Sequence, residues 1–243
     1  MMAGSGQHRK ADWVAASLVG LPAIVELAMI LHHPVPARTI GSAAAIDPFG
    51  GIAAVIEANR LFHAVLIMLM LGQLTGLLLL APRLGLRRAL VIAACVFCAI
   101  ATILLLLATT LDGFVTFELI SRCRASASGC GDAARAALAM ILASVQAFTK
   151  LGLVAQSFGL AAFAGALIQE GRNLRLAGVV GLLIALAPLT LLVSGTYVGP
   201  ALIMQILAAH ALFGMGAALL LGLGCFDGLL ATADRHEMSP PAG

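Results

Sequence analysis

The residues best placed to do chemistry are four ionisable side chains inside long apolar stretches: Glu26, His63, Lys150 and His210. Such groups are costly in hydrocarbon, so in membrane proteins they usually face a bundle interior or a wet cavity, beside a partner. Glu26 and Lys150 have opposite signs and similar expected depths in the outer half of the membrane, which predicts an ion pair. His63 and His210 would add a proton-responsive wall to the same cavity.

A polar stripe on one helix face supports this interior site. Gln146, Lys150 and Ser157 are spaced i, i+4 and i+11, which places them on one face of a helix. Gln146 therefore joins the candidate cavity residues. Two plainer interpretations stay open: the Lys150 ammonium reaches the lipid headgroups, and Glu26 makes only a structural hydrogen bond within the bundle.

The two histidines inside apolar stretches also allow a haem or metal hypothesis. A haem held by two imidazoles needs one histidine from each of two facing helices, and His63 and His210 are the candidates. Copper or another metal would use His32 and His33 together with methionines. Methionine is also ordinary core filler, and a histidine can simply be hydrogen-bonded inside the bundle. The sequence therefore leaves the cofactor unknown.

Two cysteines in a polar segment predict a disulfide. Cys123 and Cys130 enclose a short linker, and Gly129 and Gly131 allow the chain reversal that brings the two sulfurs together. A bond forms if this segment faces an oxidising compartment. The alternative is a pair of free thiols on the inner side. The other cysteines lie inside apolar stretches, where core packing is the expected role.

These residues must be positioned by helices that cross a membrane. The chain has 243 residues, of which 61% are hydrophobic and 10% charged, and its mean hydropathy is +1.06. A soluble protein of this composition would lack a polar surface, and a chain in lipid must satisfy its backbone within helices. The predicted fold class is an all-α, polytopic integral membrane bundle. Its expected spans are Trp13–Leu31, Leu61–Leu80, Ala89–Leu111, Thr149–Ile168, Leu176–Val193 and Ala201–Cys225.

The basic residues predict how this bundle is oriented. The tight turns 82–88 and 171–175 are rich in arginine, and short basic loops stay in the cytoplasm. We therefore expect a cytoplasmic tail at 1–12, a six-helix domain at 13–225 with outer loops at 32–60 and 112–148, and a cytoplasmic tail at 226–243. Within the second outer loop, Asp112 and Gly113 are expected to end a helix, whereas 133–148 can extend the fourth span outward.

Small residues indicate where helices could approach one another. Gly72 and Gly76 form a Gly-x-x-x-Gly pair, a spacing that permits close helix packing in membranes. Glycine is also common in membrane helices without such a role, so the pair alone does not locate an interface.

Several function classes are disfavoured by missing motifs. The chain has no phosphate-binding glycine loop, no zinc-finger spacing and no basic block typical of nucleic-acid binding. No catalytic template is found, which favours a protein that is not an enzyme. We expect an inner-membrane protein that binds or transports a small molecule through an outward-facing polar cavity. The alternatives are a structural or assembly subunit that binds other membrane-protein subunits, and a haem- or metal-binding redox protein.

Overall fold

The computed structural model describes residues 5–31, 56–85, 87–125, 130–169 and 172–193, and a few positions between 206 and 216. Over these residues the chain consists of helices and short turns, without strands, which confirms the all-α class. The helices are α1 (Ser5–Leu31), α4 (Ile56–Leu84), α5 (Ala89–Thr110), the π-helical turn η2 (Leu111–Val115), α6 (Thr116–Ala125), α7 (Asp132–Ile168) and α8 (Arg172–Val193).

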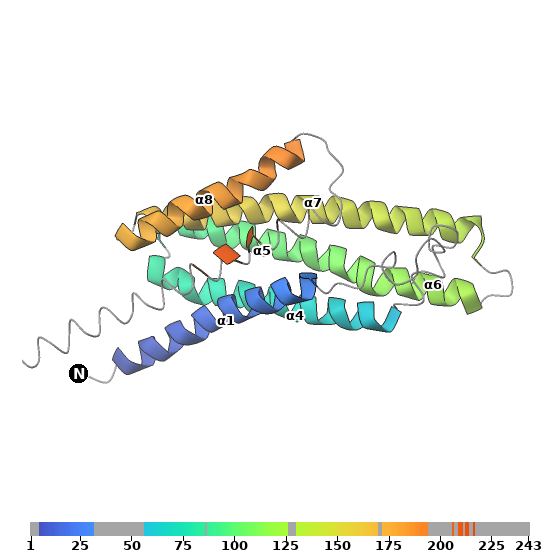
Figure 1. Cartoon of the computed structure of the whole chain (residues 1–243), viewed down its shortest axis with the longest axis horizontal. Helices are drawn as coiled ribbons and strands as arrows, with labels where there is room; N and C mark the ends of the chain where they lie inside the picture. Colours follow the sequence, from blue (N-terminus) through green and yellow to red (C-terminus); the bar gives the residue numbers. More distant parts are fainter. Residues whose placement is uncertain are drawn as a thin grey trace, which may run out of the picture.

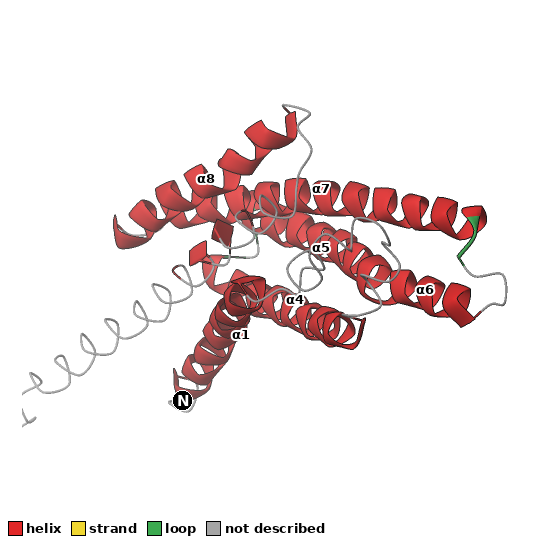
Figure 2. Ribbon diagram, turned by 45° about the vertical axis from the view of Figure 1, so that its right-hand side comes forward, coloured by secondary structure: helices red, strands yellow, loops and turns green. Residues whose placement is uncertain are grey.

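Successive long helices run in alternating directions, and α1 and α8 are inclined to the direction that α4, α5 and α7 share (Figures 1 and 2). Helix α1 packs along α4, while α5, α7 and α8 pack against one another. Helices α4 and α5 join these two groups through a smaller contact. The turns that connect α4 to α5 and α7 to α8 lie at one end of the bundle, and the connection from α6 to α7 lies at the other (Figures 1 and 2).

The turn between α4 and α5 is built around a glycine. Gly85 has a φ of +89°, a conformation that residues with a β-carbon rarely adopt. Its amide donates to the Pro82 carbonyl at 3.2 Å, and its carbonyl accepts from the Arg88 amide at 3.0 Å. The chain therefore reverses tightly at the position where the sequence predicts a basic turn.

Three helical segments are long and apolar enough to cross a membrane, judged by length and composition: Ile56–Pro82, Ala89–Ala125 and Asp132–Ile168. Shorter apolar helices cover Val14–Glu26 and Leu174–Leu186. Large apolar side chains lie on the outside of these helices, and Leu61, Met68 and Leu183 are each at least 67% exposed. Exposed apolar surface on this scale marks a surface that meets lipid or another protein. These features indicate a membrane protein.

The predicted spans agree with the helices over most of the chain. Of the first five spans, four fall within α1, α4, α7 and α8, and the third covers α5 and the first residue of η2. Most of the sixth lies outside the described residues. Helix α7 is longer than the span predicted from Thr149, because the segment 133–148 is helical and precedes Thr149 without a break. Its 37 residues extend about 55 Å, whereas the apolar core of a bilayer is about 30 Å thick.

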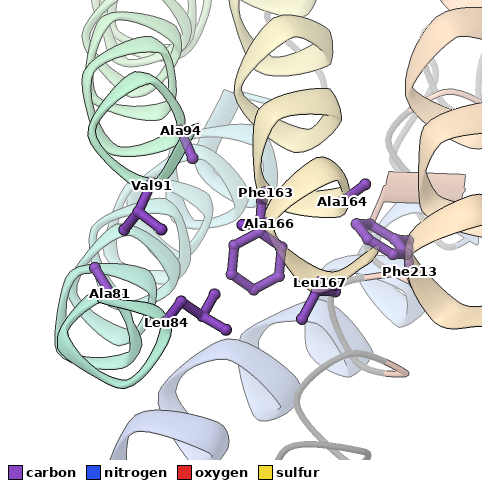
Figure 3. Packing of buried hydrophobic residues seen from close by; sticks show 9 residues of the cluster. All are labelled: Ala81, Leu84, Val91, Ala94, Phe163, Ala164, Ala166, Leu167 and Phe213. Carbon is purple, nitrogen blue, oxygen red and sulfur yellow. The ribbon is translucent and has the colours of Figure 1, made fainter. Parts of the chain in front are cut away.

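The main core cluster lies at the end of the bundle that holds the α4–α5 turn. Small residues such as Ala81, Ala94 and Ala164 let the backbones approach, and Phe163 fills the space between the helices (Figure 3). The cluster comprises Ala81, Leu84, Val91, Ala94, Phe163, Ala164, Ala166, Leu167 and Phe213.

The Gly-x-x-x-Gly pair of α4 lies at its interface with α1. A β-carbon placed on Gly76 would be 2.9 Å from the Ala15 carbonyl oxygen, so α1 and α4 can touch at this point only because the residue is glycine. Gly72 is less constrained, because its β-carbon would be 3.5 Å from Pro22 Cγ, an ordinary contact distance. Of the two interpretations of this pair, close helix packing therefore applies to Gly76.

The expectation that a helix ends at Asp112 and Gly113 is wrong. The chain continues from α5 through η2 into α6 without a break. Gly113 is needed for contact rather than for chain reversal, since a β-carbon there would overlap the side chain of His63 on α4. The Thr116 hydroxyl donates to the Leu111 carbonyl at 3.0 Å, which satisfies one carbonyl in the widened turn. Such π turns often occur at functional sites.

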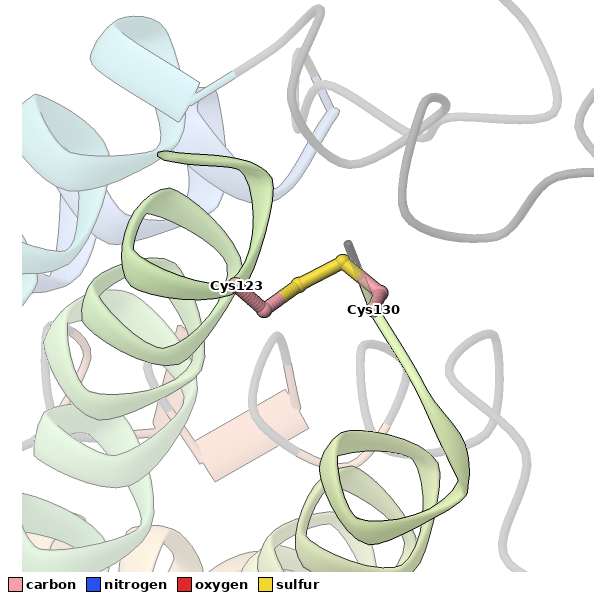
Figure 4. Close-up of a disulfide and its surroundings, with 2 residues drawn as sticks. All are labelled: Cys123 and Cys130. Carbon is pink, nitrogen blue, oxygen red and sulfur yellow. A yellow bond between two sulfur atoms is a disulfide. The ribbon is translucent and has the colours of Figure 1, made fainter. Parts of the chain in front are cut away.

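The predicted disulfide between Cys123 and Cys130 is confirmed (Figure 4). Their Cα atoms are 4.9 Å apart, and the bond links the end of α6 to the residue two positions before α7. Cys123 packs with the buried side chains of Ile120 and Leu138. The α6–α7 hairpin is therefore held by a covalent link and by a small apolar cluster of its own.

Candidate functional site

A cavity of about 90 Å³ lies inside the bundle. Four helices and the segment around residue 210 contribute to its wall. Most of the wall is apolar, but each contributing element supplies at least one polar residue. The polar lining consists of Glu26 from α1, Gln73 from α4, Thr102 from α5, Gln156 from α7 and His210.

Glu26 is anchored by an amide from the neighbouring helix. Gln73 Nε2 donates to Glu26 Oε2 at 2.7 Å. Only 7% of Glu26 is exposed, and its other oxygen, Oε1, has no hydrogen-bond partner among the described residues. A buried carboxyl oxygen without a partner carries the full cost of desolvation. Glu26 therefore presents one fixed oxygen and one unsatisfied oxygen at the cavity.

His210 and Gln156 are also incompletely paired. His210 is 4% exposed, and within the described part of the chain neither of its ring nitrogens has a hydrogen-bond partner. The same is true of Gln156 Oε1. Buried polar side chains normally find partners, so three unsatisfied side chains around one cavity are the arrangement expected of a binding site.

The size of the cavity limits what it can hold. A water molecule needs roughly 10–15 Å³ of volume measured in this way, so a cavity of about 90 Å³ holds on the order of six water-sized groups. Its apolar wall includes Leu74, Leu77, Leu160, Phe163 and Phe213. A mostly apolar hollow with a few convergent polar groups is typical of sites for small molecules.

The predicted site residues divide into two sets. Glu26 and His210, which are far apart in the sequence, line the same cavity. His63, Gln146 and Lys150 are not part of that lining. The expected ion pair between Glu26 and Lys150 does not form, because Glu26 bonds Gln73 instead, and Lys150 has no ion-pair partner among the described residues.

The cavity also lies further along α4 than the sequence suggests. His63 lies in the first third of α4, whereas the α4 residues that line the cavity run from Met70 to Leu80, towards the Gly85 turn. On α5 the lining residues lie in the middle of the helix, from Cys98 to Leu105. The hollow is therefore central in the bundle.

His63 belongs to a second polar cluster, where α4 meets η2. Its Nδ1 lies 2.7 Å from the Asn59 carbonyl oxygen, and its Nε2 lies 3.1 Å from Asp112 Oδ2. A carbonyl oxygen can only accept, so Nδ1 must carry a proton. The bond between Nε2 and Asp112 then needs a second proton, on the imidazole or on the carboxyl. The pair therefore shares one proton and is neutral overall in either form.

We expect the bond between His63 and Asp112 to contribute measurably to stability. Asp112→Ala should lower the free energy of unfolding by about 1–2 kcal/mol, because it removes the hydrogen bond between the Asp112 carboxyl and the buried Nε2 of His63. Asp112→Asn should cost less, since the amide nitrogen can donate to an unprotonated Nε2. Denaturant unfolding in detergent measures both changes.

An exposed ion pair provides the control for this comparison. Arg122 Nε lies 2.6 Å from Glu118 Oε1, and both side chains are more than half exposed. Glu118→Ala should therefore change the free energy of unfolding by less than about 0.5 kcal/mol. Equal losses in the Ala and Asn variants of Asp112 would show that the bond to His63 is not the source of the effect.

The residues proposed for haem or metal binding are not brought together. His63 and His210 belong to separate clusters, and each nitrogen of His63 already faces an oxygen. Within the described ranges, no group of three or more His, Cys, Asp and Glu side chains could hold a metal ion. His32 and His33 lie outside these ranges.

Sequence reasoning did not select Gln73 or Gln156 for the site. Both are amides within apolar stretches, which was the available signal, since an uncharged polar side chain in such a stretch also needs a partner. The polar stripe on α7 directed attention to Gln146 and Lys150 on a different face of that helix.

Comparisons with protein-family models, with curated proteins and with solved structures find no match for this chain.

Proposed function

We propose that this chain is an integral inner-membrane protein that binds a small polar molecule in the central cavity and transfers it across the bilayer. The observation that carries the proposal is the convergence of Glu26, Gln156 and His210, all with unsatisfied polar atoms, on one hollow inside an apolar bundle. Unpaired buried polar groups destabilise a protein, and a bound molecule with matching groups would remove that cost.

A purely structural role for these residues is less well supported. Structural polar groups in membrane helices bond to each other across the interface, as Gln73 and Glu26 do. A packing role would leave Glu26 Oε1 and the His210 nitrogens paired or excluded from the interior. Their position beside a hollow supports binding instead.

The proposed orientation places both termini in the cytoplasm, with six spans and the disulfide outside. Two features support it. The basic turn at Arg87 and Arg88 lies at the opposite end of the bundle from the disulfide-linked hairpin (Figure 1). Short basic loops remain cytoplasmic, and disulfides persist in oxidising compartments. Glu26 lies near the outer end of α1, which favours entry of the molecule from the outer side.

A native cysteine can report whether small molecules reach the cavity. Cys98 lines it and is 8% exposed. With Cys95 and Cys225 replaced by alanine, Cys98 is the only thiol outside the disulfide. We expect the small neutral reagent methyl methanethiosulfonate to modify Cys98 in the folded, detergent-solubilised protein, as measured by intact-mass spectrometry.

The matched control fills the hollow. Ala101 lines the cavity next to Cys98 in space, and Ala101→Phe should slow the modification at least tenfold without unfolding the protein. If Cys98 is inert in the folded native chain, or reacts equally fast in the Ala101→Phe variant, small molecules do not use this cavity and the proposed function is wrong.

A further inference from the structure

The unpaired polar atoms of the residues that line the cavity are mainly hydrogen-bond acceptors. Glu26 Oε1 and Gln156 Oε1 accept, and one ring nitrogen of a neutral His210 always accepts. Two neighbouring donors are already used, since Gln73 Nε2 donates to Glu26 and the Thr102 hydroxyl donates to the Cys98 carbonyl at 2.9 Å. The other ring nitrogen of a neutral His210 is a donor without a partner among the described residues. A molecule that complements this wall must therefore bring several donors.

The charge of the lining points in the same direction. Among the described residues that line the cavity, Glu26 is the only Asp, Glu, Lys or Arg. A carboxylate in an apolar wall must be neutralised, and the amide of Gln73 supplies a hydrogen bond but no charge. Two species can neutralise it: a proton on Oε1, or a cation that takes the place of that proton.

The rest of the wall indicates the shape of such a cation. Phe163 and Phe213 are 5% and 6% exposed, and together with several leucines they form the apolar side of the hollow. A bare, strongly hydrated metal ion would gain nothing from these surfaces. A short alkyl chain would fill them, with its charged end directed at Glu26.

We propose that the ligand is a small primary ammonium ion with a short alkyl group, and that it exchanges with a proton at Glu26. The inference rests on the proposed function and names its ligand class. In the exchange the O–H bond of the Glu26 carboxylic acid breaks, the proton leaves to solvent, and the ammonium N–H groups donate to Oε1 and Gln156 Oε1. One positive charge enters and one leaves, so the charge of the site is unchanged.

Within the described part of the chain, two other titratable groups line the cavity with Glu26. Cys98 comes from α5 and His210 from the segment around residue 210, whereas the polar lining residues of α4 and α7 are the amides Gln73 and Gln156. A protonated His210 would repel the bound cation. The form of the protein that binds the cation therefore has a neutral His210. Both titrations therefore favour ammonium binding as the pH rises.

The test compares two isomeric cations that differ only in their hydrogen-bond donors. n-Butylammonium and tetramethylammonium have the same atoms and charge, but only the former has N–H groups. Isothermal titration calorimetry on the full chain in detergent should show saturable binding of n-butylammonium, at least tenfold weaker binding of tetramethylammonium, and no binding of butyrate. In two buffers of different ionisation enthalpy, n-butylammonium should release close to one proton at acidic pH.

Variants assign the effect to Glu26. Glu26→Gln keeps the shape of the side chain. It should weaken the binding of n-butylammonium roughly a hundredfold or more, and it should abolish proton release. The control is Gln146→Leu, which removes an amide from α7 outside the cavity and should leave both unchanged. The proton count is measured on the native chain, so the test stands even if Glu26→Gln does not fold.

Two results would overturn the inference. The first is that tetramethylammonium or butyrate binds as tightly as n-butylammonium, and the second is that n-butylammonium binds without releasing a proton across the acidic to neutral range. In either case modification of Cys98 would still support the proposed function. If n-butylammonium does not bind and Cys98 is also inert, the inference and the proposed function fail together.

Discussion

Gly178→Ala is expected to destabilise the protein by about 2–3 kcal/mol, the cost of overpacking a close interface. Gly178 lies on α8, and its added β-carbon would be 2.6 Å from the Ala164 carbonyl oxygen and 2.9 Å from the Ile168 nitrogen. Both atoms belong to the main chain of α7, so no side chain can move aside to relieve the contact. The helices must separate, and the thermal unfolding midpoint in detergent should fall by several degrees.

A second helical glycine serves as the matched control. A β-carbon on Gly20 of α1 would meet nothing within 4 Å. Since alanine favours a helix over glycine by roughly 1 kcal/mol, Gly20→Ala should leave the midpoint unchanged or raise it. Similar changes in the two variants would show that α7 and α8 do not pack as closely as described.

Loss of the disulfide should have a similarly large effect. The bond closes a loop with a sequence separation of 7, for which the chain-entropy model gives roughly 2–3 kcal/mol. Cys123→Ser and Cys130→Ser should each lose this amount in urea unfolding experiments, with no further loss in the double variant.

Reduction of the native chain provides an independent measurement. Dithiothreitol should lower the stability of the native protein by about the same 2–3 kcal/mol and should not affect the double serine variant. Cys95→Ala, which removes a half-buried free thiol on α5, should have little effect. A native protein that keeps its full stability under reduction would contradict a stabilising role for the bond.

Hydropathy located the helices because burial in lipid depends on a property summed over about 20 residues. The turn at Gly85 and the disulfide could also be predicted from the sequence, since each depends on residues close together in the chain. The continuation through η2 was not, because Asp112 and Gly113 are ordinary residues for a helix end. In the structure Gly113 lies within the continuous helix, where the lack of a β-carbon lets it contact His63 from another helix.

Only some of the site residues could be predicted from the sequence, for a related reason. The sequence gives the phase of each side chain around its own helix but not the rotation of that helix against its neighbours. Glu26 and His210 could be chosen because ionisable groups are rare in apolar stretches. The choice of Gln73 rather than Lys150 as the partner of Glu26 depends on how α1 packs on α4, where Gly76 allows the closest approach.

The smaller contact between α4 and α5 has a mechanical consequence. Glu26 and Gln73 belong to the α1–α4 pair, whereas Thr102 and Gln156 belong to the group of α5, α7 and α8. The cavity therefore lies between two groups of helices, α1 with α4 and α5 with α7 and α8. The helices within each group pack more closely than the two groups pack against each other. A rotation of one helix group about the Gly85 turn would widen or close the cavity. Every helix, and the hydrogen bond between Glu26 and Gln73, would stay intact.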